Sequence, residues 1–127
     1  MTDYRDYIEI RDLLVRTIIG VNEWERRDRQ DVVITLRLYT DTRAAGESDR
    51  IEDALNYRTV TKRVIALAES SRFYLVEKLA EEIARLCVIE FGVPRVQVWV
   101  EKPGALRFAR TVGVFIERTH QDYTGSG

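Results

Sequence analysis

The spacing of the apolar residues changes twice along this chain, and this order of spacings restricts the fold more than any other feature. Residues 31–40 alternate apolar and polar side chains, which is typical of a strand with one buried face. From Tyr57 to Cys87 the apolar residues recur at every third or fourth position, which predicts helices. Alternation returns between Val96 and Ile116, so the expected order is strand, strand, helix, helix, strand, strand.

Two strands are expected before the helices. Residues 8–19 are rich in Ile, Leu and Val, and their alternation slips near Asp12, which predicts a long strand with a bulge or bend at that point. Gly20 ends this strand, and a polar connection over 21–30 leads to the second strand, expected over 31–40. The alternating apolar residues of the second strand are Val32, Ile34, Leu36 and Leu38.

The helices and the last two strands follow a polar loop, expected over 41–56. A break at 70–72 separates two apolar stripes, namely Val60, Val64, Leu67 and Ala68, then Leu75, Leu79, Ile83, Leu86 and Cys87. Gly92 and Pro94 end the second helix. The last two strands are marked by Val96, Val98 and Val100, then Val112, Val114 and Ile116. The tail over 119–127 is expected to be flexible.

This order predicts an α+β fold, in which a four-stranded antiparallel sheet carries both helices on one face, within a single domain over 1–127. Two helices leave the other face of the sheet uncovered. The apolar and aromatic side chains expected on that face are Val33, Tyr39, Trp99 and Phe115. Such a face is typical of an interface between subunits, so a homo-oligomer is expected.

Composition excludes several functional classes. The chain has 20 basic and 21 acidic residues and a net charge of −1, which argues against a general binder of nucleic acid or of anionic membranes. One cysteine, Cys87, and one histidine, His120, leave too few ligands for a Cys/His zinc site, and no metal site is expected. The N-terminus lacks a signal-peptide pattern and no apolar run reaches the ~20 residues of a membrane span, so a cytoplasmic location is expected.

Four polar residues near the ends of the expected elements are candidates for a site, and each also has an ordinary structural explanation. Glu25 lies in the polar connection, where a charge is normally solvated. Tyr57 opens the first helix, and Glu77 lies in the first turn of the second, where the helix dipole favours a carboxylate. Lys102 ends the third strand directly before Pro103, a position that commonly holds a solubilising charge. Spacing alone does not separate these explanations.

Several blocks of this sequence, in the same order, are similar to those of the dihydroneopterin aldolase family. They are IGVNEWE at 19–25, Gln30, DALNYRTVTK at 53–62, FYLVEKLAEE at 73–82, EKPGALRFA at 101–109 and VGVFIER at 112–118. The resemblance runs from about Ile8 to Arg118 and implies the tunnelling fold of that family.

The family has two close branches, the dihydroneopterin aldolases of folate synthesis and the dihydroneopterin triphosphate 2′-epimerases, which form the monapterin epimer. The runs at 53–62, 27–34 and 105–109 resemble the epimerase branch. The Lys-Pro-Gly at 102–104 and the run at 112–118 resemble the aldolase branch. The residues that flank Tyr57, in the run at 53–62, favour the epimerase, and the aldolase is the alternative.

The resemblance also implies roles for individual residues. The family's catalytic tyrosine, lysine and loop glutamate correspond here to Tyr57, Lys102 and Glu25. Its pterin-binding glutamate corresponds to Glu77, and the other substrate-binding positions that it implies are Leu75, Val76, Asn56 and Arg107. Asn56 stands where many aldolases carry histidine. Family members form tetrameric rings, usually stacked as octamers, with sites between neighbouring subunits.

The implied reaction needs no cofactor, because a dihydropterin carries an N5=C6 imine that takes up the electrons released when the C1′–C2′ bond breaks. Lys102 therefore need not form a Schiff base, and its ammonium would stabilise charge that develops at N5 and the 2′-oxygen. Tyr57 would act as acid or base, Glu25 would order the catalytic water or the side-chain hydroxyls, and Glu77 would accept hydrogen bonds from the pterin 2-amino group and N3–H. Re-addition of the aldehyde on its other face would invert C2′, which is the epimerase reaction.

A triphosphate substrate would require further cations. The arginines in loops or strand ends beside the expected site are Arg26, Arg27, Arg29, Arg107 and Arg110, and Arg107 is favoured because it follows the lysine loop directly. These arginines are also a normal share of surface charge.

Two other functional classes stay open. A non-catalytic oligomeric scaffold would keep the fold without the chemistry, and the presence of all four site residues argues against it. Another tunnelling-fold enzyme, such as a cyclohydrolase, is disfavoured because the chain lacks a Cys/His zinc set.

Overall fold

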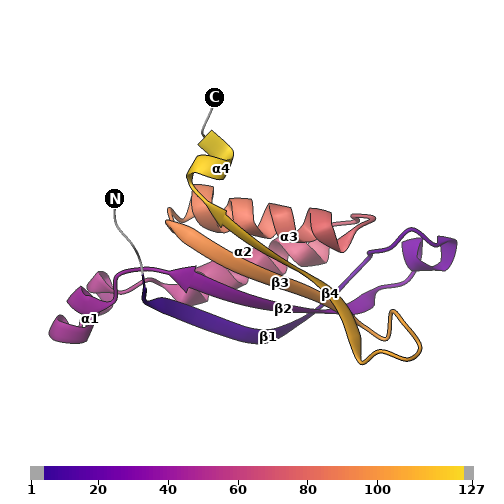
Figure 1. The fold of residues 1–127 in the computed structure, drawn as a ribbon, viewed down its shortest axis with the longest axis horizontal. Coiled ribbons are helices and arrows are strands. Elements are labelled where there is room, and N and C mark those ends of the chain that lie inside the picture. Colours follow the sequence, from indigo (N-terminus) through magenta and orange to yellow (C-terminus); the bar gives the residue numbers. More distant parts are fainter. Residues whose placement is uncertain (1–4, 125–127) are drawn as a thin grey trace.

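A four-stranded antiparallel sheet forms one layer of the computed structural model, which describes residues 5–124 (Figure 1). Its strands are β1 (Tyr7–Thr17), β2 (Gln30–Tyr39), β3 (Arg95–Pro103) and β4 (Thr111–Thr119). Their order in the sheet follows their order in the chain, and each neighbouring pair is antiparallel. The α+β fold expected from the sequence is confirmed.

Two helices between β2 and β3 form the second layer and cover one face of the sheet (Figure 1). These two helices are α2 (Tyr57–Ser70) and α3 (Val76–Arg85). Two shorter helices lie outside this layer, α1 (Arg43–Ser48) and α4 (Gln121–Thr124). Short 3-10 turns lie at η1 (Glu23–Arg26) and η2 (Ile51–Asp53), and a π-helical turn, η3 (Leu86–Glu90), extends α3. Within the described residues, no helix has the length and apolar character needed to cross a membrane.

The core lies between the sheet and these two helices. The alternating side chains expected in β2 and β3 are fully buried, namely Val32, Ile34, Leu36 and Leu38 of β2 and Val96, Val98 and Val100 of β3. Those expected in β4 are less buried, since Val114 and Ile116 are partly buried and Val112 is exposed. They pack against the stripes of the helices, with Val60, Val64 and Ala68 from α2 and Leu79 and Ile83 from α3. Burial of each large aliphatic side chain contributes about 1.5–3 kcal/mol. Cys87 belongs to this core, and burial raises the pKa of its thiol to about 12.

A β-bulge interrupts β1 where the sequence predicts it. The register with β2 shifts between Ile10 and Leu13, and Asp12 takes a left-handed conformation with φ of +57°. The Asp12 N–H donates a hydrogen bond to Thr35 Oγ1 over 3.0 Å, which gives the bulged backbone a partner. After the bulge, β1 still contributes to the core, with Leu13 packed against it and Val15 buried in it.

The structure differs from the sequence prediction at two places. The segment over 41–56, expected to be a polar loop, contains α1 and η2. The second helix begins at Val76, and Leu75 precedes it as an extended cap residue that is 51% exposed, so Leu75 is not part of the buried stripe.

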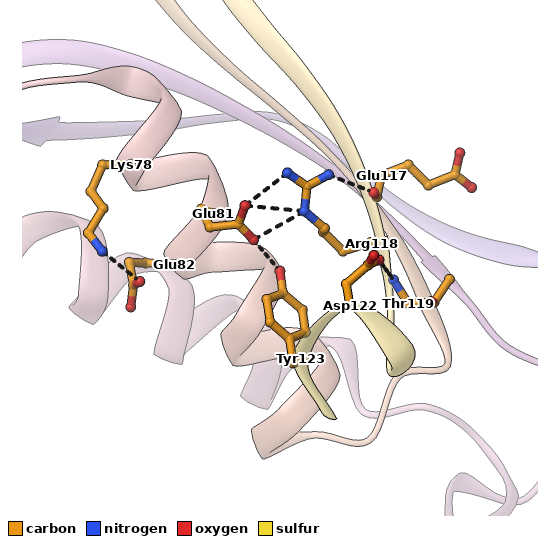
Figure 2. Close-up of polar contacts among 8 residues, drawn as sticks. All are labelled: Lys78, Glu81, Glu82, Glu117, Arg118, Thr119, Asp122 and Tyr123. Carbon is orange, nitrogen blue, oxygen red and sulfur yellow. Dashed lines mark hydrogen bonds and ion pairs between the residues drawn. The ribbon is translucent and has the colours of Figure 1, made fainter. Parts of the chain in front are cut away.

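The expected flexible tail is held against α3 over its first part (Figure 2). Arg118 donates to the Glu81 carboxylate, and the Tyr123 hydroxyl donates to the same carboxylate over 2.5 Å. The hydrogen bonds from Arg118 are the main cause of a lowered Glu81 pKa. The flexibility expected over 119–127 stays a prediction, with these contacts holding its first part, and residues 125–127 lie outside the described residues.

The other face of the sheet is covered by no helix in residues 5–124 (Figure 1). Aromatic side chains pair across strands on this face, with 4.6 Å between the ring centres of Trp99 and Phe115. The Arg37 guanidinium lies over the Trp99 ring, and Phe115 is half exposed. Burial of this face in a homo-oligomer stays a prediction.

Candidate functional site

One end of the sheet holds a pocket of about 350 Å³. Three segments form most of its lining: the loop after β1, residues 74–77 at the start of α3, and residues 102–105 at the end of β3, with Gln30 of β2 and Val112 of β4 beside them. Figure 1 shows these segments together at the right-hand end of the molecule. The structure brings together five of the residues predicted from the sequence, namely Glu25, Leu75, Val76, Glu77 and Lys102.

Glu25 and Lys102 form an ion pair in this pocket, with 2.6 Å between Oε2 and Nζ. Glu25 is 5% exposed, which is rare for a carboxylate without a cationic partner. Burial alone would raise the Glu25 pKa, but hydrogen bonds from Lys102, the backbone N–H of Asn22 and the side chain of Gln30 outweigh it and lower the pKa to about 2. Glu25 is therefore an anion at neutral pH.

Local backbone geometry explains how Glu25 reaches this position. Asn22 and Glu25 form a capping box at the start of η1, and the Asn22 N–H donates to Glu25 Oε1 over 3.1 Å. Gly20 has φ of +129°, and a Cβ atom on Gly20 would collide with the Glu25 carboxylate. The glycine therefore leaves room for the buried carboxylate.

Glu77 lies on another wall of the pocket, at the second residue of α3. Its side chain is exposed, and no hydrogen bond or ion pair reaches its carboxylate from residues 5–124. The helix dipole favours a negative charge at this position. Glu77 therefore offers two free acceptor oxygens to a ligand, whereas the Glu25 oxygens are engaged.

The residues before Glu77 add backbone donors and apolar surface. Leu75 caps α3, so the N–H groups of Val76 and Glu77 are among the first four of the helix, which have no partner within it. Exposed apolar side chains surround the pocket, namely Val21, Trp24, Tyr74 and Leu75. A flat, partly polar ligand suits these walls.

Tyr57 and Asn56 do not line this pocket within one chain. Tyr57 is the first residue of α2, and the 14 residues of that helix span about 21 Å. The far end of α2 lies beside the pocket segments, because Ser71 O accepts a hydrogen bond from Thr17 at the end of β1. Tyr57 is half exposed at the other end of this helix, and the Asn56 side chain caps the helix by accepting from the Thr59 N–H.

The arginines considered for a triphosphate also lie outside the pocket lining. The Arg26 and Arg29 guanidinium groups donate to backbone carbonyls, so they are not free cations. The Arg107 guanidinium lies 5.4 Å from the ring centre of Phe108, which is 94% exposed on the loop between β3 and β4. Arg110 approaches Glu101 at 4.0 Å.

Two residues that hold Glu25 had no role in the sequence prediction. Gln30 Nε2 donates to Glu25 Oε2 over 3.3 Å and to the Ile19 carbonyl over 2.5 Å. The other residue is Asn22, and the Asn-x-x-Glu spacing of a capping box is a sequence signal for it. No sequence signal identifies the contact of Gln30, because it depends on how β2 begins beside the loop.

Within residues 5–124, no three His, Cys, Asp or Glu side chains are grouped so that they could hold a metal ion. The pocket instead combines a buried carboxylate–ammonium pair, a free carboxylate and free helix N–H groups. This arrangement can orient a ligand by a pair of hydrogen-bond donors and place a cation beside a reacting oxygen or nitrogen.

The sequence is similar to one protein family and to characterised members of two kinds. The sequence profile of the family described as FolB, dihydroneopterin aldolase, matches residues 8–117. Dihydroneopterin aldolase of Escherichia coli K12 is 41% identical over 113 residues, covering 89% of this chain and 93% of that protein. Dihydroneopterin triphosphate 2′-epimerase of Pseudomonas aeruginosa is 43% identical over 107 residues, covering 84% of this chain and 87% of that protein.

The folic acid synthesis protein FOL1 of Dictyostelium discoideum is 42% identical over 114 residues, and the match spans 90% of this chain but 17% of that longer protein. Among solved structures, E. coli dihydroneopterin aldolase in complex with neopterin has a TM-score of 0.86 at 41% identity, covering 89% of this chain and 98% of that one. FolB from Vibrio cholerae O1 has a TM-score of 0.88 at 45% identity, covering 90% and 97%. Aldolases and epimerases are thus similar to this chain to the same degree.

Proposed function

The chain belongs to the dihydroneopterin aldolase family, and on this basis we propose that it cleaves dihydroneopterin to 6-hydroxymethyl-dihydropterin and glycolaldehyde. The observation that carries the proposal is one pocket in which the free Glu77 carboxylate lies on a wall near the Glu25–Lys102 pair. The first group recognises the pterin ring, and the second acts on its side chain.

Glu77 supplies the recognition in this proposal. A pterin presents a 2-amino group and N3–H side by side, and the two oxygens of a carboxylate match this pair of donors. The carboxylate has no partner in the described part of the chain, so it exchanges only water for the ligand. Trp24, Tyr74 and Leu75 offer apolar surface to the flat ring.

The chemical step uses the imine of the substrate. A base removes the proton of the 2′-hydroxyl, the C1′–C2′ bond breaks, glycolaldehyde leaves, and the bonding electrons move into N5=C6 to form an enamine. A proton delivered to C1′ then gives the hydroxymethyl product. The Lys102 ammonium stabilises the charge that develops at N5 and the 2′-oxygen, and Glu25 holds this ammonium in place by its 2.6 Å contact.

The proton transfers are assigned to a tyrosine from a second copy of the chain. Tyr57 is too far from the pocket of its own chain to take part, as the length of α2 requires. We propose that Tyr57 of the partner subunit completes the site in a homo-oligomeric ring. The half-exposed ring of Tyr57 and the uncovered face of the sheet support this arrangement.

Epimerisation at C2′ of dihydroneopterin triphosphate is the second candidate function. The run DALNYRTVTK over 53–62 and the 43% identity with the P. aeruginosa epimerase favour it. Asn56, however, has a structural role as the cap of α2, and none of the candidate arginines lines the pocket. These two observations make the unphosphorylated substrate and cleavage the first choice.

Product analysis tests the proposal. Purified protein is incubated separately with dihydroneopterin and with its triphosphate, and the oxidised products are resolved chromatographically as neopterin, monapterin and 6-hydroxymethylpterin. We expect mainly hydroxymethylpterin from dihydroneopterin. Mainly monapterin triphosphate from the second substrate, with little cleavage, would establish the epimerase instead, and no product from either would reject both functions.

A further inference from the structure

Arg26 joins two walls of the pocket although it does not line the pocket itself. It is the last residue of η1, directly after Glu25, and its side chain is partly buried. Arg26 Nη1 donates to the carbonyl of Gly20 over 2.9 Å, on its own loop. The same nitrogen donates to the carbonyl of Phe73 over 3.0 Å, and Nη2 donates to that of Arg72 over 2.5 Å.

Two further contacts strengthen this connection. The Arg26 guanidinium lies over the Tyr74 ring, 4.0 Å from its centre, and Tyr74 lines the pocket. The Arg72 side chain donates back to the Arg26 carbonyl over 3.1 Å. A planar guanidinium can use its edges for carbonyls and its face for an aromatic ring at the same time, which an ammonium cannot do.

In the described residues, no other side chain forms a hydrogen bond between the loop of Glu25 and the segment before Glu77. The hydrogen bonds between residues 20–30 and 71–77 all start from the Arg26 guanidinium or end at the Arg26 carbonyl. Glu25 is fixed from its own loop and by Lys102. Besides the packing of α3 against the sheet, the side-chain hydrogen bonds that link the segment before Glu77 to the loop of Glu25 therefore all involve Arg26.

We propose that Arg26 is a positioning residue, which sets the distance between the Glu77 carboxylate and the Glu25–Lys102 pair. The expectation that this positioning affects the affinity for a pterin rests on the proposed function. Arg26 does not itself line the pocket, so it acts through residues that do, namely Gly20 and Tyr74, and through the backbone of residues 72 and 73.

Arg29 provides a matched control on the same loop. Its Nη1 donates to the carbonyl of Glu69 over 2.9 Å and to that of Arg16 over 3.2 Å. The chemistry is that of Arg26, a guanidinium bound to backbone carbonyls. Arg29 reaches the end of α2 but not residues 71–77, and it does not line the pocket.

The first measurement is amide hydrogen–deuterium exchange on the full-length wild type, Arg26→Met, Arg29→Met and Arg26→Lys. We expect the amides of residues 72–77 to exchange about tenfold faster in Arg26→Met and at the wild-type rate in Arg29→Met. Thermal unfolding is followed alongside, and both methionine variants are expected to lose similar stability. Unchanged exchange at 72–77 in Arg26→Met, or equal acceleration in both methionine variants, would overturn the positioning role.

The second measurement is a fluorescence titration of the same four proteins with neopterin. We expect about tenfold weaker binding by Arg26→Met, an intermediate loss for Arg26→Lys, and binding within about twofold of wild type for Arg29→Met. Equal affinity of Arg26→Met and wild type would overturn the role in binding. A wild type that neither binds neopterin nor cleaves dihydroneopterin would reject the proposed function, and the exchange data would still decide whether Arg26 positions the 72–77 segment.

Discussion

At the Glu25 carboxylate, burial and hydrogen bonding act in opposite directions. Burial raises the pKa, and the hydrogen bonds led by Lys102 lower it to about 2, against an ordinary value of 4.5. Between these two pH values the unfolded chain binds the proton that the folded chain does not. The free energy of unfolding should therefore decrease as the pH falls from about 4.5 towards 2, by up to about 3 kcal/mol.

The Glu25→Gln variant tests this dependence. Denaturant unfolding at fixed protein concentration, between pH 6 and pH 3, should show a smaller loss of stability on acidification in the variant than in wild type. Glu23→Gln is the control, because Glu23 lies on the same short helix, is exposed and lines no part of the pocket. A pH dependence that Glu25→Gln leaves unchanged would contradict the assignment of the lowered pKa to this residue.

At the scale of elements, the C-terminal helix α4 depends on one shared carboxylate (Figure 2). The Tyr123 hydroxyl and Arg118 both donate to Glu81 on α3, and burial is the main cause of a raised Tyr123 pKa. We expect Tyr123→Phe to lower the free energy of unfolding by about 1–2 kcal/mol, since it removes a hydrogen bond to a charged acceptor.

Equilibrium unfolding measures this effect. Tyr74→Phe is the matched control, because the Tyr74 hydroxyl is bonded to no group in the described chain and its ring is 61% exposed. A loss of equal size in both variants would show that the hydroxyl of Tyr123 is not what holds α4.

The strands were predictable because apolar and polar side chains alternate along them. The bulge at Asp12 was also predictable, since alternation slips there and aspartate tolerates a positive φ. Helix α1 was not, because none of its residues is buried and it has no apolar stripe. Leu75 has helical spacing with the stripe of α3, but it caps that helix and is exposed, which periodicity cannot distinguish.

The candidate site was predictable only in part. The sequence gives no sign that Glu25 is buried against Lys102, since 77 positions separate them and only the sheet brings them together. Arginines in a loop predict a cationic surface, whereas the Arg26 guanidinium donates its hydrogen bonds to backbone carbonyls. Such partners have no sequence signal, because every residue has a carbonyl.

At the scale of the whole molecule, the length of α2 separates Tyr57 from the pocket of its own chain. If the site is completed by Tyr57 of the partner subunit, two inactive variants should complement each other. Lys102→Met and Tyr57→Phe, unfolded together and refolded as a mixture, should regain about a quarter of wild-type activity, since each site then takes one residue from each of two copies at random. Each variant refolded alone is the control.

A mixture no more active than its components would contradict the shared site. It would require Tyr57 to act within its own chain or to have no part in the reaction. The complementation therefore separates the assembly from the chemistry, because Tyr57→Phe changes no residue of the pocket lining and Lys102→Met changes one.

The most direct test of the central claim, that this pocket holds a pterin through Glu77, is the dissociation constant for neopterin of wild type and Glu77→Gln. We predict about 10–100-fold weaker binding by the variant, because one acceptor oxygen and the charge are lost. The melting temperature should fall by at most a few degrees, since no group in residues 5–124 is bonded to this carboxylate and only its favourable interaction with the helix dipole is lost. Binding by Glu77→Gln as tight as by wild type, with Glu23→Gln as control, would contradict the account.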